Sequence, residues 1–217
     1  METVVPIEFA PGIEGLDQRV SLWINGNNSP WSDPFWAFMS EIKVWIPLYV
    51  LVVILLIWRM GWKKGLVAIA CIALAFFCDE RINNLIKELV GRIRPCNDPL
   101  MLSAGINVLE TGGGFSFPSG HACNSFGFAF VSALCFKWID AARMKRSKVD
   151  WVDIYNVVII TWAILVAISR VMVARHFFGD VLVGAMIGTA MGIIWACIAR
   201  AVCRRIPDPQ VPCSRRR

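Results

Sequence analysis

Charged residues are scarce in this chain of 217 residues, at 18% of the total, where soluble globular domains average about 25%. Hydrophobic residues reach 57%, and the mean hydropathy is +0.58. This balance excludes a disordered chain, a coiled coil and a small disulfide-stabilised scaffold. It indicates a membrane protein, and the ten Trp and thirteen Phe suit helices that are anchored at a bilayer interface.

The sequence also lacks a Cys-x-x-Cys pair and a basic start followed by an apolar core. Most of its eight Cys lie within apolar runs, where small packing residues are expected. Cys96 lies in a polar segment and could be a free thiol or half of a pair. Acidic residues such as Glu8 and Glu14 interrupt the N-terminal region, so we expect no cleavable signal there.

Uncharged runs separated by polar segments predict an all-α, polytopic membrane helix bundle with about five transmembrane helices. The expected spans are 42–60, 65–88, 119–137, 154–174 and 180–200. The second span ends in the polar stretch Asp79-Glu80-Arg81-Ile82-Asn83-Asn84. Gly184, Gly188 and Gly192 recur every four residues in the last span, which favours close packing within the bundle over dimerisation.

N-terminal interfacial helices are expected before the first span. One helical face carries Leu16, Val20, Trp23 and Ile24, and the other carries Asp17, Gln18 and Arg19. Trp31, Phe35, Trp36 and Phe38 follow. The sequence therefore divides into an interfacial amphipathic segment over 1–41, a transmembrane domain over 42–203 and a basic cytoplasmic tail over 204–217.

The 22 basic residues are distributed unevenly over the loops. Most of them lie near 59–64, over 137–148 and from 200 onward. The positive-inside rule places these segments and the C-terminus in the cytoplasm, and the loops 88–119 and 170–180 on the outer face. Membrane orientation thus accounts for the net charge of +6, and we expect no nucleic-acid partner.

Three polar clusters lie at the outer ends of these helices. They are Lys87 to Pro95, Pro118-Ser119-Gly120-His121, and Ser169-Arg170 followed by His176 and Asp180. Lys87, Arg94 and Arg170 offer positive charges that suit phosphate oxygens. Ser119 and Gly120 open a helix, where free N–H groups and the helix dipole favour an anion.

The chain has only two His, and both fall in these clusters. His176 and Asp180 are neighbours on a helix, so the carboxylate could fix the imidazole tautomer. Two His and one Asp could also bind a metal ion. The three cations would repel a divalent ion, so we expect a phosphate site without metal or cofactor, although the residues alone do not say which His attacks.

In their order and spacing, the clusters resemble the K-x6-RP, PSGH and SR-x5-H-x3-D motifs of the type 2 phosphatidic acid phosphatase (PAP2) superfamily, with no departure. The resemblance covers about 87–180 and implies a short bacterial membrane lipid phosphatase, whose catalytic domain would be 42–203. It implies that His176 is a nucleophile forming phosphohistidine, that Asp180 orients it, and that His121 is general acid and then base. The phosphate-binding residues it implies are Lys87, Arg94, Ser119, Gly120 and Arg170.

Two polar residues, Glu80 and Asn84, lie one to two turns before Lys87. Ionisable groups within a membrane helix suggest function, which makes a supporting role around Lys87 one interpretation. A structural network of Glu80, Arg81 and Asn84 paired with one another is the other.

The expected function is hydrolysis of a phosphate monoester or diphosphate on an envelope lipid, with undecaprenyl diphosphate or lipid A as the substrate type. The alternatives are a phosphatidylglycerophosphate or phosphatidic acid phosphatase, a soluble-substrate haloperoxidase, a metal hydrolase, and a membrane transporter or lipid-binding protein without activity. The expected location is the bacterial inner membrane, with the site on the periplasmic face and the lipid and bilayer as partners. The sequence leaves the oligomeric state open, and it favours a flexible connector over a gate for the loop Gly112-Gly113-Gly114.

Overall fold

The computed structural model describes residues 8–139 and 151–207. In these two ranges the regular structure is entirely helical, as the sequence predicts. The elements, in chain order, are α1 (Gly12–Asn25), α2 (Asp33–Ser40), η1 (Ile42–Trp45), α3 (Ile46–Met60), α4 (Trp62–Val90), η2 (Pro95–Asn97), α5 (Pro99–Ser103), α6 (Gly120–Ile139), α7 (Trp151–Met172) and α8 (Phe178–Cys203).

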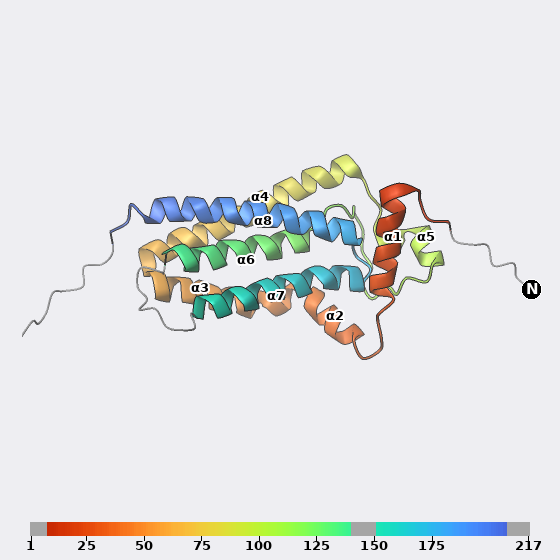
Figure 1. Ribbon diagram of the computed structural model, residues 1–217, viewed down its shortest axis with the longest axis horizontal. Helices are drawn as coiled ribbons and strands as arrows, with labels where there is room; N and C mark the ends of the chain where they lie inside the picture. The colour runs from red at the N-terminus through yellow and green to blue at the C-terminus, as the bar shows by residue number, and fades with distance from the viewer. Residues whose placement is uncertain (1–7, 140–150, 208–217) are drawn as a thin grey trace, which may run out of the picture.

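The long helices α3, α4, α6, α7 and α8 run side by side as a bundle (Figure 1). Four segments of the described chain are long and apolar enough to cross a membrane: Ile42–Met60, α6, α7 and α8. The second predicted span corresponds to α4, which packs against α3, α6 and α8. Asp79, Glu80 and Arg81 interrupt its apolar sequence, so composition alone does not mark it as a span.

Helix α6 lies at the centre of the bundle, where it packs most closely against α8. A Cβ added at Gly184 or Gly188 of α8 would collide with the main-chain carbonyl of Ser119 or Cys123 on α6. The helix backbones therefore touch without intervening side chains. This contact confirms that the glycine stripe packs within the bundle.

Aromatic rings join α3, α6 and α7 in the core. Tyr49 contacts Phe128 edge to face with ring centroids 4.9 Å apart, and Phe128 contacts Trp162 in the same way at 5.9 Å. Such edge-to-face pairs add about 0.5–1.5 kcal/mol each beyond the burial of apolar area. These rings hold α6 and α7 in place, and the outer ends of these two helices carry polar clusters.

Helix α1 lies across the end of the bundle, beside the end of α7 and the start of α8 (Figure 1). Its polar side chains Gln18 and Asn25 are buried against the protein, while Leu16 and Trp23 are exposed. This helix therefore presents its apolar face outward, as an interfacial helix does.

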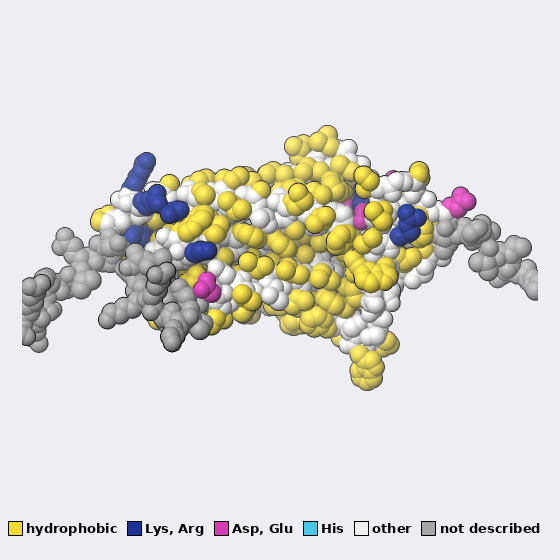
Figure 2. All heavy atoms as spheres, viewed as in Figure 1, with side chains coloured by type: hydrophobic (Ala, Val, Ile, Leu, Met, Phe, Trp, Pro, Cys, Tyr) yellow, Lys and Arg dark blue, Asp and Glu magenta, His cyan; other side chains and the backbone are white. Residues whose placement is uncertain are grey.

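Hydrophobic side chains cover the length of the bundle, and Lys and Arg gather toward its two ends (Figure 2). Exposed tryptophans lie near both ends: Trp23 and Trp31 belong to the N-terminal region, and Trp58 and Trp62 lie in α3 and α4 on either side of the turn between them. This arrangement resembles the two aromatic belts of membrane proteins. The distal part of the predicted basic tail, 208–217, lies outside the described residues.

Candidate active site

Three segments that are distant in sequence meet at the end of the bundle beside α1. The Ser116 N–H donates to the Arg92 carbonyl at 2.7 Å, which joins the segment before α6 to the one after α4. The Ser119 N–H donates to the Asp180 carbonyl at 2.9 Å, which joins the start of α6 to α8. The three polar clusters of the sequence therefore lie at the same end of the molecule.

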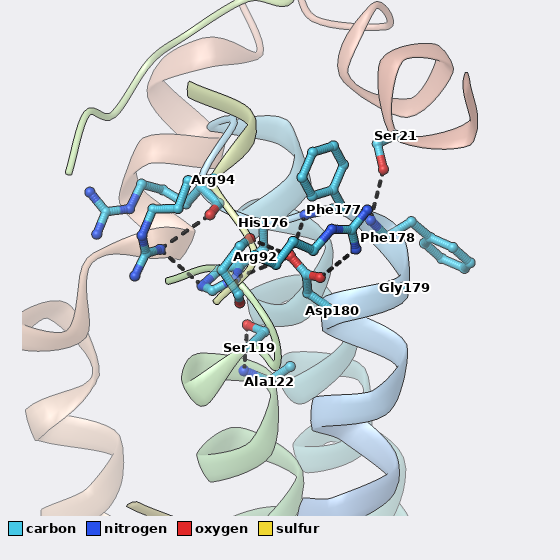
Figure 3. Close-up of polar contacts among 12 residues, drawn as sticks. Ser21, Arg92, Arg94, Ser119, Ala122, His176, Phe177, Phe178, Gly179 and Asp180 are labelled. Carbon is cyan, nitrogen blue, oxygen red and sulfur yellow. Dashed lines mark hydrogen bonds and ion pairs between the residues drawn. The ribbon is translucent and has the colours of Figure 1, made fainter. Parts of the chain in front are cut away.

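The imidazole of His176 is buried between two polar partners (Figure 3). Its Nδ1 lies 2.7 Å from the carbonyl oxygen of Ser116, and its Nε2 lies 3.3 Å from Nη1 of Arg94. A carbonyl oxygen only accepts hydrogen bonds and a guanidinium only donates them. The geometry therefore assigns the proton to Nδ1 and leaves the lone pair of Nε2 facing Arg94.

Burial lowers the pKa of His176 from 6.5 to about 4. The neighbouring Asp180 opposes this change because its negative charge favours the imidazolium, whereas Arg170 and Arg94 favour the neutral ring. The ring is consequently neutral, with an unprotonated Nε2, at every pH well above about 4.

Asp180, in the first turn of α8, is completely buried. Its Oδ2 accepts hydrogen bonds from the Ser116 hydroxyl and from the Phe177 N–H at 2.9 Å, and its Oδ1 pairs with Arg92 at 2.7 Å. The distance from Oδ2 to Nδ1 of His176 is 3.7 Å. The carboxylate thus acts on the imidazole across a longer gap than the Ser116 carbonyl, which is the direct partner.

Arg94 is held over Nε2 of His176 by the loop backbone. Its Nε donates to the Gly113 carbonyl at 2.9 Å and its Nη1 to the Arg175 carbonyl at 3.2 Å. Burial and the positive charge of Arg175 lower the pKa of Arg94. The guanidinium of Arg94 is therefore fixed in place. An anion bound beside Nε2 of His176 would relieve the repulsion between Arg94 and Arg175.

The remaining predicted cations approach from α4 and α7. Nζ of Lys87 lies 3.8 Å from the point that a Cβ on Gly120 would occupy, which puts the ammonium beside the start of α6. Arg170 is 2% exposed and pairs with Glu110 at 3.3 Å. Its Nε is buried without a hydrogen-bond partner, so this donor is available to a ligand.

His121 and Ser119 belong to the start of α6. The Ser119 hydroxyl accepts a hydrogen bond from the Ala122 N–H at 3.4 Å, in the manner of a helix cap. His121 lines a cavity of about 120 Å³ together with Ser40, Tyr49 and other residues. It is close enough to Arg170 and His176 to interact electrostatically with both.

Residues 64–203 match the family model described as the PAP2 superfamily. The chain belongs to the PAP2 superfamily. It is 32% identical over 210 residues to the lipid A 4'-phosphatase of Bacteroides thetaiotaomicron, covering 95% of this chain and 86% of that protein. It is 28% identical over 186 residues to phosphatidylglycerophosphatase B of Bacillus subtilis, covering 81% and 79% of the two chains.

The fold agrees with this membership. The crystal structure of a transmembrane PAP2-type phosphatidylglycerolphosphate phosphatase from Bacillus subtilis superposes with a TM-score of 0.71 at 22% identity, covering 91% of this chain and 90% of that one. The family model, the homologues and the membrane-spanning helices identify an integral membrane lipid phosphatase.

Two residues predicted around Lys87 pair with each other in this PAP2 phosphatase. Asn84 donates to Glu80 at 3.3 Å on an exposed face of α4, while Asp79 and Asn83 turn inward and are buried. Glu80 still interacts electrostatically with Lys87. The contact between Glu80 and Asn84 agrees with the structural interpretation, and a supporting role for Glu80 stays a prediction.

Sequence reasoning missed four residues of the PAP2 site: Asp17, Arg92, Ser116 and Arg175. Arg92 and Arg175 fall at variable positions within motifs, where their charge beside a motif residue was the available signal. Ser116 acts partly through its carbonyl, which any residue would supply, and Asp17 lies far away in sequence. Cys96 is a buried free thiol, which settles the open question about its state.

Proposed function

We propose that this PAP2 phosphatase removes a phosphate monoester from lipid A through a phosphohistidine intermediate on His176. The observation that carries the proposal is the unprotonated Nε2 of a buried imidazole, whose lone pair accepts a hydrogen bond from the fixed guanidinium of Arg94. Such a nitrogen becomes a nucleophile when an arriving phosphate accepts the Arg94 N–H in its place and so frees the lone pair. The 32% identity to a lipid A 4'-phosphatase over almost the whole chain supports lipid A as the substrate class.

The reaction would proceed in two displacements at phosphorus. Nε2 of His176 forms a bond to phosphorus while the bond from phosphorus to the lipid oxygen breaks, and His121 gives that oxygen a proton. His121 then takes a proton from water, whose oxygen attacks phosphorus and breaks the bond to Nε2. Inorganic phosphate leaves, and both imidazoles return to their starting states.

The cations would stabilise the charge that develops on the phosphoryl oxygens. Arg94, Lys87 and the unpartnered Nε of Arg170 approach the site from three different elements. Ser119 and the backbone at Gly120 add the start of α6. Because these cations already supply the positive charge that a phosphate needs, the proposed mechanism uses neither a metal ion nor a cofactor.

The proposed location is the bacterial inner membrane, with the site on the periplasmic face and the C-terminus in the cytoplasm. The loops of the site share the end of the bundle with α1, and the basic segment near Lys63 lies at the other end of α4. Under the positive-inside rule, the site would then face outward. A fusion of the C-terminus to a reporter enzyme that works only in the periplasm tests this orientation. We expect that fusion to be inactive, and activity would contradict the proposed location.

Hydrolysis of phosphatidylglycerophosphate is the second candidate, because a Bacillus subtilis phosphatase named for that lipid is 28% identical to this chain. The decisive experiment measures phosphate release by purified protein from lipid A, phosphatidylglycerophosphate, undecaprenyl diphosphate and phosphatidic acid in separate detergent micelles. We expect the highest kcat/KM for lipid A, with no loss after EDTA treatment. Equal or better turnover of another lipid would overturn the substrate, and inhibition by EDTA would overturn the metal-free mechanism.

A further inference from the structure

Helix α1 is hydrogen-bonded to both of the helices that flank His176. At the end of α7, Nδ2 of Asn25 donates to the Met172 carbonyl at 2.9 Å. At the start of α8, the Ser21 hydroxyl accepts from the Phe178 N–H at 2.8 Å (Figure 3). The polar face of α1 therefore satisfies backbone groups on either side of the loop that carries His176.

A second set of contacts leads from α1 to the carboxylate of Asp180. Oδ1 of Asp17 accepts from the Gly179 N–H at 2.7 Å, and Oδ2 lies 2.7 Å from Nη1 of Arg92. The same Nη1 lies 2.7 Å from Oδ1 of Asp180. The guanidinium also stacks on the ring of Phe177, with its central carbon 3.8 Å from the ring centroid. One cation is thus held between two carboxylates and against an aromatic face.

We propose that Asp17 and Arg92 are positioning residues for Asp180, so that Asp17 on the inner face of α1 helps to hold the carboxylate beside His176. This inference rests on the proposed function, in which Asp180 and His176 act on a lipid phosphate. It assigns a role to a helix that the sequence identifies only as an interfacial segment.

The physical reason is that Arg92 separates two negative charges while neutralising the one beside His176. The side chains of Arg92 and Asp17 are only 19% and 12% exposed, and Asp180 is buried, so water screens these charges weakly. Without Arg92, the carboxylates of Asp17 and Asp180 would repel each other, and Asp180 would shift away from Ser116. Its uncompensated charge would also favour the imidazolium form of His176.

Charged and titratable groups lie on every element around His176. They are Asp180 on α8, Lys87 on α4, Arg92 and Arg94 after α4, Glu110 before α6, His121 on α6, Arg170 on α7, Arg175 in the turn after α7, and Asp17 on α1. Asp180, Arg170, Arg94 and His121 interact electrostatically with the ring itself. Arg94 contacts the ring, whereas the direct partners of Arg92 are the carboxylates of Asp180 and Asp17. Removal of Arg92 should therefore raise the pKa of His176, although removing a cation near the ring also acts directly in the same direction.

The test compares Arg92→Gln, Arg92→Lys and Asp17→Asn in purified full-length protein, with kcat, KM and the pH profile of kcat/KM measured on lipid A micelles. For Arg92→Gln we expect kcat to fall about 10–100-fold while KM stays within about threefold, because the interaction acts on the nucleophile and not on lipid binding. In Arg92→Gln the acid limb of the kcat/KM profile, where activity falls on acidification, should move up by about one pH unit. Arg92→Lys should return this limb to its wild-type pH.

Asp17→Asn keeps an acceptor for the Gly179 N–H but removes the negative charge that pairs with Arg92. We expect kcat to fall about 3–10-fold, with the acid limb at or below its wild-type position, because Arg92 then acts on Asp180 alone. Glu14→Gln and Arg19→Gln remove charges from exposed positions of the same helix and should leave kcat and the limb unchanged. These two variants match the charge changes of Asp17→Asn and Arg92→Gln.

The outcomes separate this inference from the proposed function. If wild-type protein releases phosphate but Arg92→Gln and Asp17→Asn behave like the two controls, the positioning role is wrong. An acid limb that stays in place in Arg92→Gln, or that rises equally in Asp17→Asn, contradicts it as well. If Arg92→Gln does not fold, Asp17→Asn decides by its kcat and its limb. Wild-type protein inactive on every lipid would overturn the proposed function itself.

Discussion

The two sides of the His176 ring differ in how completely their charges are paired. On the Nδ1 side, Ser116, Asp180, Arg92 and Asp17 form a closed chain in which each charge has a direct partner. On the Nε2 side, Arg94 contacts backbone carbonyls and the ring, and the positive charge of Arg175 acts against that of Arg94. The paired side suits a structural and orienting role. The underpaired side suits an anion that arrives from outside, because it would supply the missing negative charge.

The largest loss of activity should follow removal of the His176 imidazole, which lies between the two sides. His176→Ala removes the proposed nucleophile, and we expect kcat to fall by about 10⁴-fold or more, as for nucleophiles in other covalent mechanisms. Phosphate release from lipid A micelles measures this. A protein that keeps its melting temperature and full turnover without the ring would refute the phosphohistidine mechanism.

The Nε2 side can be weakened next. Arg94→Ala removes the guanidinium that is held beside the proposed nucleophile, and we expect kcat to fall about 10²–10³-fold, the range seen when a charge-stabilising donor is lost. Arg94→Lys keeps the charge but loses the geometry held by Gly113 and Arg175, so it should recover only part of the activity. Full activity of Arg94→Ala in the same assay would show that this side does not bind the phosphoryl group.

The Nδ1 side should be less sensitive to a single change. Ser116→Ala removes the hydroxyl that donates to Asp180 but keeps the carbonyl that accepts from His176, so we expect kcat to fall only about 10–30-fold. Ser132→Ala is the matched control, because Ser132 is a buried serine of α6 bonded to Phe128 and Tyr155. If both variants lose activity equally, the effect belongs to packing and not to the site.

The pH profile tests the balance between the two sides with no mutation. Because the pKa of His176 is lowered to about 4, its imidazole stays neutral on acidification until that pH. At about pH 5.5 an ordinary histidine would be neutral in only about a tenth of the molecules. We therefore expect kcat/KM to be about tenfold higher there than an ordinary histidine would allow. An acid limb near 6.5 would mean that the ring is not desolvated in this way.

The fold was largely predictable because hydrophobic runs are a strong signal in membrane chains. The spans over 42–60 and 154–174 correspond to Ile42–Met60 and to α7 within a few residues. The second span was hard to judge because Asp79 and Asn83 of α4 are polar yet buried against neighbouring helices. A linear sequence does not show which face of a helix such residues occupy.

From the sequence, the site could be predicted only at positions where particular residue types recur at a fixed spacing. The clusters around Lys87, His121 and His176 have that form, and the structure brings them to one end of the bundle. The contact between Asp17 and Arg92 could not be foreseen, since it depends on how α1 crosses the bundle end. The direct partner of His176 could not be foreseen either, because every residue has a main-chain carbonyl and the sequence does not indicate which one accepts the hydrogen bond.

That carbonyl has an evolutionary consequence. The atom that sets the tautomer of His176 belongs to the main chain at Ser116, so no point mutation deletes it. Neighbouring side chains can therefore change in descendants of this protein while the nitrogen proposed to attack keeps its protonation state and orientation.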